Sequence, residues 1–333
     1  MRLSALVEIP HHVCCRYRLR AFQPYLEQAG HDFSYHALPR HWWQRLRLAE
    51  AIPCKNALIQ RRLLSTLEIR RLRRKAETLF FDFDDAVWLR DSFSGRPLRS
   101  RRRERRFAQQ MQQMDHVIAG NHFLAQHARP FGQDVRVIPT CVDPARYPLA
   151  QHAEDHAAQL VWIGSASTLR SLEQQRPWFE ALGRRFPNIS LRLICDQFVS
   201  FHSLRVIPRL WSEESEAADL APADIGIAWM PDDDWSRGKC GLKVLQYMAA
   251  GLPVIANPVG VHCEMIRDGE NGFLVTSPAE WTDAVEYLTR HSDVRRRMGL
   301  AGRARTEKEY SVAHGAKLWL ELLQHAAQFR RAA

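Results

Sequence analysis

Short apolar runs alternate with amphipathic runs along the whole sequence, and this alternation restricts the possible folds more than any other feature. The apolar runs have the length of β-strands, and the amphipathic runs have the period of helices. Strands that alternate with helices form parallel sheets with helices on both faces. The strands expected in the first half are Leu3–Ile9, Leu58–Gln60, Thr78–Phe83, His116–Ala119 and Val135–Ile138, and the helices are Arg18–Ala29, Arg61–Lys75, Arg101–Met114 and Phe123–Arg129.

A polar stretch at 151–158 interrupts this pattern, and we interpret it as a linker. The alternation then starts again. Two such units in tandem predict an α/β protein of two Rossmann-like domains, at 1–150 and 151–312, whose parallel sheets face a cleft between the domains. The strands expected in the second unit are Gln159–Ile163, Ser190–Cys195, Leu204–Ile207, Asp224–Trp229 and Pro253–Ala256. The helices are Leu169–Phe186 and Gly241–Ala250, followed by several helices from about Pro278 to Gln328.

Composition excludes several classes of protein. Hydrophobic residues make up 46% of the chain and charged residues 25%, which is typical of a globular protein. No apolar run approaches the roughly 20 residues that span a bilayer, and Leu3–Ile9 is too short for the core of a signal peptide. Seven cysteines form no CxxC pair, and their odd number fits neither a disulfide framework nor a zinc site. These features predict a reducing, cytoplasmic location.

The positive charge is concentrated in the first half. Residues 1–150 hold 26 Lys and Arg against 14 Asp and Glu, a net +12, while the whole chain carries +10. Two segments, Arg61–Lys75 and Arg96–Arg106, contain seven basic residues each. On charge alone such clusters fit nucleic acid, an anionic membrane or a phosphorylated substrate. No helix-turn-helix, RRM or KH signature accompanies them, so we do not expect a nucleic-acid partner.

The segment Arg237–Ala256 carries the clearest sign of a binding site. Gly238 and Gly241 bracket the start of an expected helix, where glycines let backbone N–H groups approach an anion and the helix dipole adds positive potential. Lys239 and Lys243 are four residues apart, so we expect both to face that position. A diphosphate would suit this arrangement. An ordinary strand-to-helix junction with two solvated lysines is the equally weighted alternative.

The part of this segment from Gly241 to Ala256, with its run Met-Ala-Ala-Gly-Leu-Pro-Val-Ile-Ala, resembles the donor-binding motif of glycosyltransferases with the GT-B fold. It is most similar to the large retaining group called family 4. The resemblance covers 159–310 and is weaker in the first half. It implies that 151–312 binds a nucleotide diphosphate sugar and that a helix within 313–333 crosses back to the first domain. The other matching motifs are Trp162–Thr168, Asp224–Ile227, Pro258–Val261, Glu264 and Asp268–Val275.

The chain departs from the family at one pair of positions. The family has two glutamates eight residues apart, the first contacting the transferred sugar and the second the donor ribose. Here these positions are Gly238 and Gln246. Gln246 can still exchange hydrogen bonds with a ribose, but Gly238 cannot replace a carboxylate. Either Lys239 and the acidic loop Asp232–Asp234 take over sugar recognition, or the donor sugar differs.

Further donor contacts follow from the same resemblance. In GT-B proteins the nucleobase lies near the loop that carries Arg209 and Trp211 here, and a stacking role for Trp211 is the expectation. Arg16 follows the first strand. Its guanidinium could contact a donor phosphate or lie at a solvated helix start, and we give the two interpretations equal weight. The remaining expected donor-binding residues are Gly164, Ser165, Thr168, Gly238, Cys240, Gly241, Leu242 and Gln246.

Asp82-Phe-Asp-Asp85 ends a strong strand of the first domain. Carboxylates at this place could orient sugar hydroxyls or act as a base, and we favour such a role for Asp84 and Asp85. The spacing also resembles a DxD metal site, but that motif belongs to the other major glycosyltransferase fold, so we expect no metal and no cofactor. With Lys239 and Lys243, these two carboxylates form the expected catalytic set.

A basic and aromatic surface is expected in the first domain. The helix predicted at Arg61–Lys75 would turn Leu63, Leu64, Leu67 and Leu72 inward and its arginines outward. Trp42 and Trp43 lie among basic residues as well. The combination resembles the surface by which many glycosyltransferases of this fold approach anionic membranes to reach lipid-linked acceptors. A merely solvated arginine-rich helix is the alternative.

Taken together, the resemblance implies a glycosyltransferase that moves a hexose-type sugar from a nucleotide diphosphate to a glycan, lipid-linked or other acceptor. The expected setting is bacterial surface polysaccharide synthesis, with retention of configuration, at the inner face of the membrane. Two alternatives stay open. One is a nucleotide-sugar epimerase of the same fold, and the other is a degenerate homologue that binds nucleotide or glycan without turnover.

Overall fold

The computed structural model describes residues 1–52, 55–153 and 158–332. The chain forms two compact units, each built around its own sheet. Unit 1 consists of Met1–Cys141, Asp233–Cys240 and Val312–Ala333, and unit 2 of Val142–Asp232 and Gly241–Ser311. Of the linker predicted at 151–158, residues 154–157 lie outside the described residues.

This division differs from the predicted boundaries in two places. Residues 142–150 belong to unit 2, because Val142 N–H donates to the Tyr310 carbonyl and Ala150 N–H to the Ala250 carbonyl. The segment Asp233–Cys240, predicted within the second domain, packs in unit 1. Both differences arise from contacts between distant parts of the chain, which local sequence patterns do not report.

Unit 1 contains a six-stranded parallel sheet with the strand order β2-β1-β3-β4-β5-β6. The order reverses between β1 and β3, and ligands of such open sheets bind beyond the carboxyl ends of the strands at the reversal. The strands are β1 (Arg2–Val7), β2 (Asp32–Ala37), β3 (Asn56–Gln60), β4 (Thr78–Phe83), β5 (His116–Ala119) and β6 (Val135–Val137).

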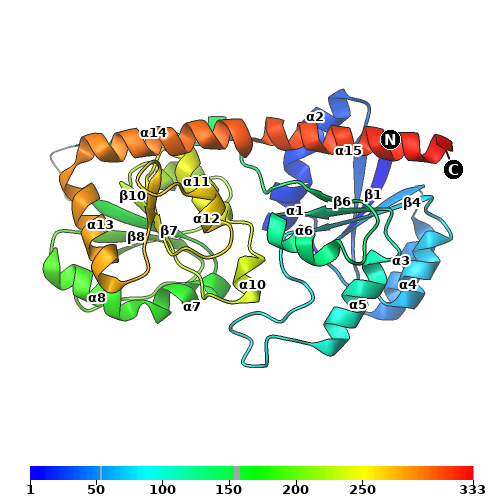
Figure 1. Cartoon of the computed structure of the whole chain (residues 1–333), viewed down its shortest axis with the longest axis horizontal. Helices are drawn as coiled ribbons and strands as arrows, with labels where there is room; N and C mark the ends of the chain where they lie inside the picture. Colours follow the sequence, from blue (N-terminus) through cyan, green and yellow to red (C-terminus); the bar gives the residue numbers. More distant parts are fainter. Residues whose placement is uncertain (53–54, 154–157, 333) are drawn as a thin grey trace. The chain divides into compact units, whose positions relative to one another are not determined.

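Helices cover both faces of this sheet (Figure 1). Apolar residues of α1, α2 and α15 share a core with one face, and those of α3 to α6 share a core with the other. On α15, Trp319 packs edge-on against Phe33 with 5.9 Å between the ring centres. The helices are α1 (Val13–Arg18), α2 (Gln23–Gln28), α3 (Trp42–Ala51), α4 (Thr66–Arg73), α5 (Arg101–Met111), α6 (His122–Ala128), α10 (Asp234–Arg237) and α15 (Val312–Ala332).

The helix predicted at Arg61–Lys75 is shorter than expected. Ser65 caps α4 in a reciprocal capping box with Glu68, and this fixes the helix start at Thr66. Arg61 precedes the helix in the left-handed region, with φ of 57°. The expectation that Leu67 points inward was wrong, because Leu67 is 49% exposed.

Unit 2 contains a second six-stranded parallel sheet, with the order β12-β11-β10-β7-β8-β9. This is the strand order of a dinucleotide-binding Rossmann domain, and it reverses between β7 and β10. The strands are β7 (Gln159–Ile163), β8 (Ser190–Cys195), β9 (Arg205–Leu210), β10 (Ile225–Ala228), β11 (Val254–Ala256) and β12 (Gly272–Leu274).

The helices of unit 2 also lie on both sides of its sheet. Helices α7 and α8 cover one face, and α11 and α14 cover the other (Figure 1). The α/β fold class and the parallel sheets predicted from the sequence are confirmed. The helices are α7 (Ala166–Gln174), α8 (Arg176–Arg185), α9 (Glu216–Leu220), α11 (Leu242–Ala249), α12 (His262–Met265), α13 (Pro278–Arg290) and α14 (Ser292–Glu309), with a 3-10 turn at Pro144–Arg146.

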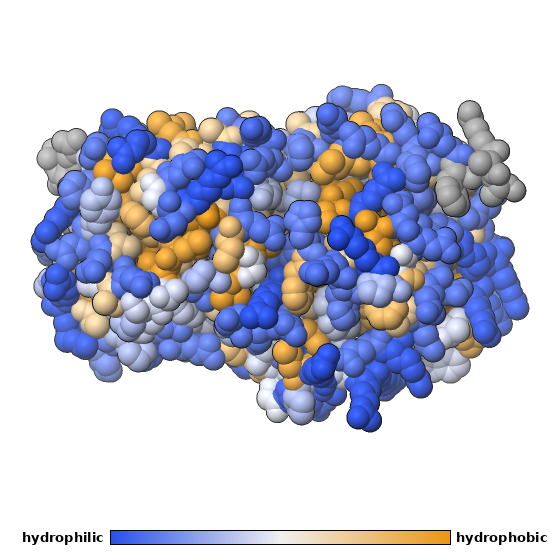
Figure 2. Space-filling model, viewed as in Figure 1, coloured by the Kyte–Doolittle hydropathy of each residue, from blue (hydrophilic) through white to orange (hydrophobic). Residues whose placement is uncertain are grey.

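Hydrophilic residues cover most of the face shown in Figure 2, with hydrophobic residues visible between them. Each helix of the described part of the chain is too short or too polar to cross a bilayer.

Candidate functional site

The carboxyl ends of β1, β3 and β4 bring several charged side chains of unit 1 together. Arg61 follows β3, and Asp84 and Asp85 follow β4. Arg61 Nε lies 3.2 Å from Asp84 Oδ1, and its Nη2 donates to Asp85 Oδ2. The left-handed backbone of Arg61 is uncommon for a residue with a side chain, and such strain is frequent at functional sites. These contacts place Arg61 at the centre of a charged cluster where ligands of open α/β sheets bind.

Lys239 completes this cluster. Its Nζ lies 2.9 Å from Asp85 Oδ1, so Asp85 is held by two cations. Burial raises the pKa of the Asp85 carboxyl, but the charges of Lys239 and Arg61 and their hydrogen bonds outweigh burial and lower it. Burial lowers the pKa of Lys239, while the charge and hydrogen bond of Asp85 raise it above its usual value. Both members of the pair are therefore ionised at neutral pH.

The other two carboxylates of this stretch differ from Asp85. Asp82 forms a buried ion pair with Arg18 of α1, whose Nη1 also donates to the Ile138 carbonyl at 2.5 Å, so this pair ties α1 to β4 within the core. Asp84 Oδ1 is buried and accepts no hydrogen bond, although Arg61 Nε is near. Of the three acids, Asp84 therefore has acceptor capacity that the protein does not use.

The segment Asp233–Cys240 is held in unit 1 by contacts of its own. Asn121, which caps α6, donates from Nδ2 to the Lys239 carbonyl at 3.0 Å. The thiol of Cys240 donates to the Asp84 carbonyl at 3.3 Å. A Cβ atom at Gly238 would lie 2.8 Å from both the Cβ and the backbone nitrogen of Ala86. The position at which the family has a sugar-contacting glutamate thus has no room for a side chain in this arrangement.

Lys239 and Lys243 do not lie one turn apart on a single helix, as the prediction assumed. Lys239 lies after α10 in unit 1, whereas Lys243 lies on α11 in unit 2. Gly241 between them has φ of 63°, in the left-handed region, which breaks the helical spacing that the prediction assumed. Lys243 instead places its ammonium 4.1 Å from the ring centre of Trp162.

In unit 2, the start of α11 lies beside the point where the strand order reverses, because α11 follows β10. The first N–H groups of a helix have no partner within the helix, and the helix dipole makes this end positive. Gly241 precedes it, and a Cβ there would lie 2.7 Å from the Met265 sulfur. Leu242 opens the helix, and Gln246 is buried one turn later. The start of α11 thus combines a positive helix end with a close-packed glycine turn, which are two of the features on which the predicted anion site rests.

A hydrogen-bonded network connects the next two strand ends of unit 2. The amide of Asn257, after β11, bonds both the N–H and the carbonyl of Met230 after β10. Its backbone carbonyl lies 2.9 Å from His262 Nδ1. A carbonyl can only accept, so His262 carries its proton on Nδ1. Burial, with a smaller contribution from the charge of Lys243, outweighs the hydrogen bond to Asn257 and lowers the pKa of His262 to about 4, so this histidine is neutral at pH 7.

The glycine turn after β7 is less open than expected. Gly164 N–H donates to the Ile194 carbonyl, and Ser165 N–H donates to Thr168 Oγ1 at 3.2 Å. Asp196 Oδ1 accepts from the Ala166 N–H at 2.7 Å. Groups of the protein itself, one of them a carboxylate, therefore already bind N–H groups at the start of α7. Of the starts of α7 and α11, the start of α11 is the better anion site.

The remaining predicted donor residues make contacts of their own. Arg209 is exposed on β9, an edge strand, with its Nε 4.0 Å from Asp219. Trp211 donates its indole N–H to Glu216 at 3.0 Å and is partly buried. Arg16 is buried in α1 with its guanidinium 4.8 Å from the ring centre of Tyr17.

Sequence reasoning missed two residues at these sites. Arg61 was placed in a basic helix, although its position directly after a strand could have marked it as a residue of the sheet's carboxyl edge. His262 lies between the matching motif Pro258–Val261 and Glu264 and was not singled out, because nothing in the sequence shows that it is buried beside Lys243. Both depend on tertiary packing.

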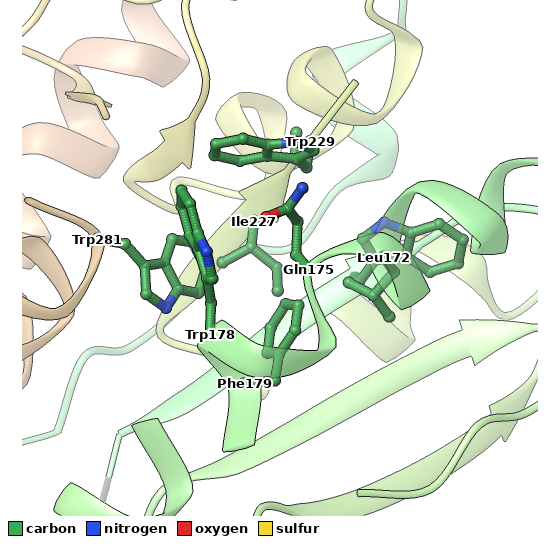
Figure 3. A pocket seen from close by; sticks show the side chains of 9 residues that line it. Leu172, Gln175, Trp178, Phe179, Ile227, Trp229 and Trp281 are labelled. Atoms are coloured by element: carbon green, nitrogen blue, oxygen red, sulfur yellow. The ribbon is translucent and has the colours of Figure 1, made fainter. Parts of the chain in front are cut away.

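Unit 2 also has a small aromatic cavity of about 10 Å³, roughly the space of one water molecule. Figure 3 shows Trp178, Trp229 and Trp281 around it, with the amide of Gln175 directed toward the Trp229 ring. Trp178 and Trp229 meet edge to face, with 4.6 Å between ring centres. The cavity is part of the core between the sheet and α8, and it has no space for a sugar or a base.

A divalent cation at Asp82–Asp85 does not fit the donors in this structure. Arg18 pairs with Asp82, Arg61 with Asp84 and Asp85, and Lys239 with Asp85. Positively charged side chains thus already surround each carboxylate that a DxD site would use.

Comparisons with known proteins agree with this architecture. Residues 202–291 match the family described as Glycosyl transferases group 1. A trehalose synthase of Pyrococcus horikoshii is 36% identical over 83 residues, which is 25% of this chain and 20% of that protein. The match therefore spans only about a fifth of this relative's length.

Solved structures extend the likeness to the whole chain. Sucrose-phosphate synthase of Thermosynechococcus elongatus superposes with a TM-score of 0.75 at 16% identity, over 100% of both chains. HepE of Anabaena, solved in complex with UDP and glucose, superposes with a TM-score of 0.71 at 14% identity, over 97% of this chain and 99% of that chain. At such identities these structures establish the fold. Together with the sequence match, they show that the chain has the GT-B fold and that its residues 202–291 are similar to the group 1 glycosyltransferases.

Proposed function

We propose that this chain transfers a glycosyl group from a nucleoside diphosphate sugar to the hydroxyl group of an acceptor. The start of α11, at the strand reversal of unit 2, carries the proposal. There a positive helix end, Gly241 and Lys243 together suit a diphosphate. HepE, which has the same fold, was solved with UDP and glucose, and this supports a uridine nucleotide as the first donor to test.

The reaction breaks the bond between the anomeric carbon and the diphosphate oxygen and forms a bond from that carbon to the acceptor oxygen. The nucleoside diphosphate leaves with the electron pair, and the acceptor hydroxyl loses its proton. Lys243 and the N–H groups at the start of α11 would stabilise the negative charge that develops on the leaving diphosphate. His262 is neutral at pH 7, so it brings no charge of its own to the diphosphate beside Lys243.

We assign the charged cluster of unit 1 to the acceptor. Asp85 is a weak base, because two cations hold it in its ionised form, so its role is to position Arg61 and Lys239. The side chain of Asp84 is partly exposed and would receive the hydrogen bond of an acceptor hydroxyl. Lys239 acts through Asp85 in this scheme and not through the donor.

The finer expectations remain part of the proposal. They are a hexose-type donor sugar, retention of configuration, and a glycan or lipid-linked acceptor of bacterial surface polysaccharide synthesis. Support for a membrane-bound acceptor comes from α3, where Trp42 and Trp43 are 59% and 45% exposed and Arg47 lies over the Trp43 ring. Amphipathic aromatic rings beside arginines suit the interface of an anionic membrane.

One observation favours a second candidate function. Gly238 replaces the family's sugar-contacting glutamate and packs against Ala86 without space for a larger side chain. A homologue that binds nucleotide without turnover would show this feature. Both the transferase and the binding homologue would bind nucleotide, so an assay of activity separates them.

A thermal-shift experiment with UDP, GDP, ADP, CMP and their sugars tests the donor site. A bound ligand raises stability with the logarithm of its excess over Kd, so the preferred nucleotide gives the largest shift. Lys243→Ala should remove most of this shift, and Lys308→Ala, which changes an exposed lysine of α14, should leave it intact.

Absence of a shift with every nucleotide would contradict the donor site. A shift with one nucleoside diphosphate, together with release of that nucleotide from its sugar in the presence of acceptors, supports transfer. A shift without any release after screening acceptors favours the binding homologue.

A further inference from the structure

A second basic cluster lies next to the charged cluster of unit 1 and takes no part in the scheme above. It consists of Arg62, Arg90 and Arg103. Arg62 directly follows Arg61, and Arg90 lies in the loop that leads from Asp85 to α5. Arg103 lies in the first turn of α5. All three thus come from segments at the carboxyl edge of the sheet, where Asp84 and Asp85 lie.

Specific hydrogen bonds hold the three segments together. Arg103 Nη1 donates to the Leu89 carbonyl at 2.6 Å, which places its guanidinium beside residue 90. Gln110, two turns after Arg103 on α5, donates from Nε2 to the Arg62 carbonyl at 3.1 Å and accepts from the Leu64 N–H at 2.7 Å. The segment of Arg62 therefore runs along the same face of α5 that carries Arg103.

Arg90 fixes the shape of the loop between them. Its Nη1 donates to the carbonyl groups of Pro97 and Arg99 at 2.7 and 2.8 Å, which closes the loop 90–99 on itself. The side chain is thus held by the backbone and leaves its remaining guanidinium donors for another acceptor. The cluster is a preformed set of donors.

The charge of this cluster is only partly neutralised. Glu8 pairs with Arg62 at 3.3 Å, whereas neither Arg90 nor Arg103 forms an ion pair within the described part of the chain. Burial lowers the pKa of Arg103, and the charges of Arg90 and Arg62 lower it further, which agrees with their closeness. Two positive charges thus remain without a partner, and Arg103 also opposes the positive end of the α5 dipole. Figure 2 shows a mostly hydrophilic surface over α5 on the face in view.

We propose that Arg62, Arg90 and Arg103 form a binding site for a phosphate group of the acceptor. The proposal rests on the proposed function, since it names the class of acceptor that this edge of unit 1 would hold. Two uncompensated positive charges match the charge of a phosphate monoester at pH 7. The planar guanidinium group binds phosphate through paired hydrogen bonds, which suits three arginines better than three lysines would. Donor phosphates are assigned to α11 in unit 2, so this site is additional.

The test uses the full chain with saturating UDP, so that the donor site is filled, and titrates inorganic phosphate at constant ionic strength by calorimetry. The test variant is Arg90→Gln/Arg103→Gln. The matched control is Arg184→Gln/Arg297→Gln, which removes the same charge from two exposed positions of unit 2. We expect the test variant to weaken phosphate binding by about tenfold or more, because two charge-assisted hydrogen-bonding groups are lost, and the control to match the natural chain.

Equal phosphate affinity in the test variant and the natural chain, or no phosphate binding by the natural chain, would overturn the proposal. Failure of UDP to bind in the same samples would count against the proposed function and leave the phosphate comparison readable. If the loop 90–99 fails to fold in the test variant, the variant Arg62→Gln/Arg103→Gln takes its place. This second variant keeps Arg90 and therefore the hydrogen bonds that close the loop.

A second arm identifies the source of the phosphate. Flotation with phosphatidylcholine vesicles, with and without phosphatidic acid, is compared for the same proteins. Loss of phosphate affinity with unchanged flotation supports a water-soluble phosphorylated acceptor, and loss of both supports a lipid phosphate. Loss of flotation with unchanged phosphate affinity would mean that the arginines serve only a membrane surface, and the proposal would be wrong.

Discussion

Lys239 Nζ lies 2.9 Å from Asp85 Oδ1, and this ion pair joins two segments of unit 1 that are far apart in the sequence. Asp85 follows β4, and Lys239 belongs to the segment Asp233–Cys240, which lies in the chain between β10 and α11 of unit 2. Because Arg61 contacts the same carboxylate, Asp85 joins two cations in one cluster.

Lys239→Ala should lower the free energy of unfolding by about 1–3 kcal/mol, because Asp85 loses one of two charge-assisted partners. Urea denaturation followed by circular dichroism measures the change. A double-mutant cycle with Asp85→Asn should give a coupling of about 0.5–3 kcal/mol. Lys308→Ala, at an exposed position, is the control and should stay within about 0.5 kcal/mol of the natural chain. Zero coupling would show that the contact does not stabilise the protein.

Gly238→Glu restores the family's glutamate and should nevertheless destabilise the protein. The new Cβ would lie 2.8 Å from Ala86, so the segment must shift, at a cost of about 1–3 kcal/mol. Thermal unfolding of Gly238→Ala and Gly238→Glu measures this cost. Ala86→Gly in combination with Gly238→Ala should restore part of the loss, because it removes one of the two clashing atoms. An unchanged melting temperature in Gly238→Ala would contradict the close packing.

Mild acid should destabilise the protein through His262. Burial lowers its folded-state pKa to about 4 from an ordinary value of 6.5, so the unfolded chain binds the proton more readily. The stability from neutral His262 is complete above pH 6.5 and is lost as the pH falls toward 4, in total about 3 kcal/mol.

Urea midpoints between pH 7 and pH 4 measure this effect. His262→Asn keeps a donor for the Asn257 carbonyl but does not titrate, so its stability should depend less on pH over this range. His202→Gln, at an exposed position, should follow the natural chain. A parallel pH dependence in His262→Asn and the natural chain would rule out this histidine as the cause.

Trp42→Ser/Trp43→Ser should reduce binding to anionic vesicles. Burial of both rings at the interface contributes at most several kcal/mol to the free energy of binding, and the arginines that remain act mainly through their charge. Cosedimentation with phosphatidylglycerol vesicles at low and high salt measures the two contributions. Leu210→Ser, which removes a side chain that is 71% exposed in unit 2, is the control. If the double variant binds as the natural chain does, α3 is not a membrane surface.

Much of the fold was predictable because its elements carry strong local patterns. Thr78–Phe83 is an unbroken run of buried residues, and the structure has β4 at the same residues. The strands β2 and β12, each at the edge of a sheet, were missed because their apolar patterns are weak. There Asp32–Ala37 carries polar residues, and Gly272–Leu274 has only three residues. An edge strand needs less apolar surface than a central one, so its pattern is weaker.

The candidate site was likewise predictable from the sequence only in part. Parallel strands place their carboxyl ends at one edge, so Asp84, Asp85 and Gly241 could be proposed as site residues from their position after a strand or before a helix. That Lys239 pairs with Asp85, and that Arg61 joins them, depends on contacts that no local pattern encodes.

The sequence by itself determined the α/β class, the parallel sheets and the likeness of 202–291 to the group 1 glycosyltransferases, because periodicity and short motifs are local properties of the chain. Only the tertiary structure decided which unit Asp233–Cys240 joins and which carboxylate keeps unused acceptor capacity. The physical reason is that ion pairs and close packing join residues distant in sequence, and their geometry exists only after the strands have assembled.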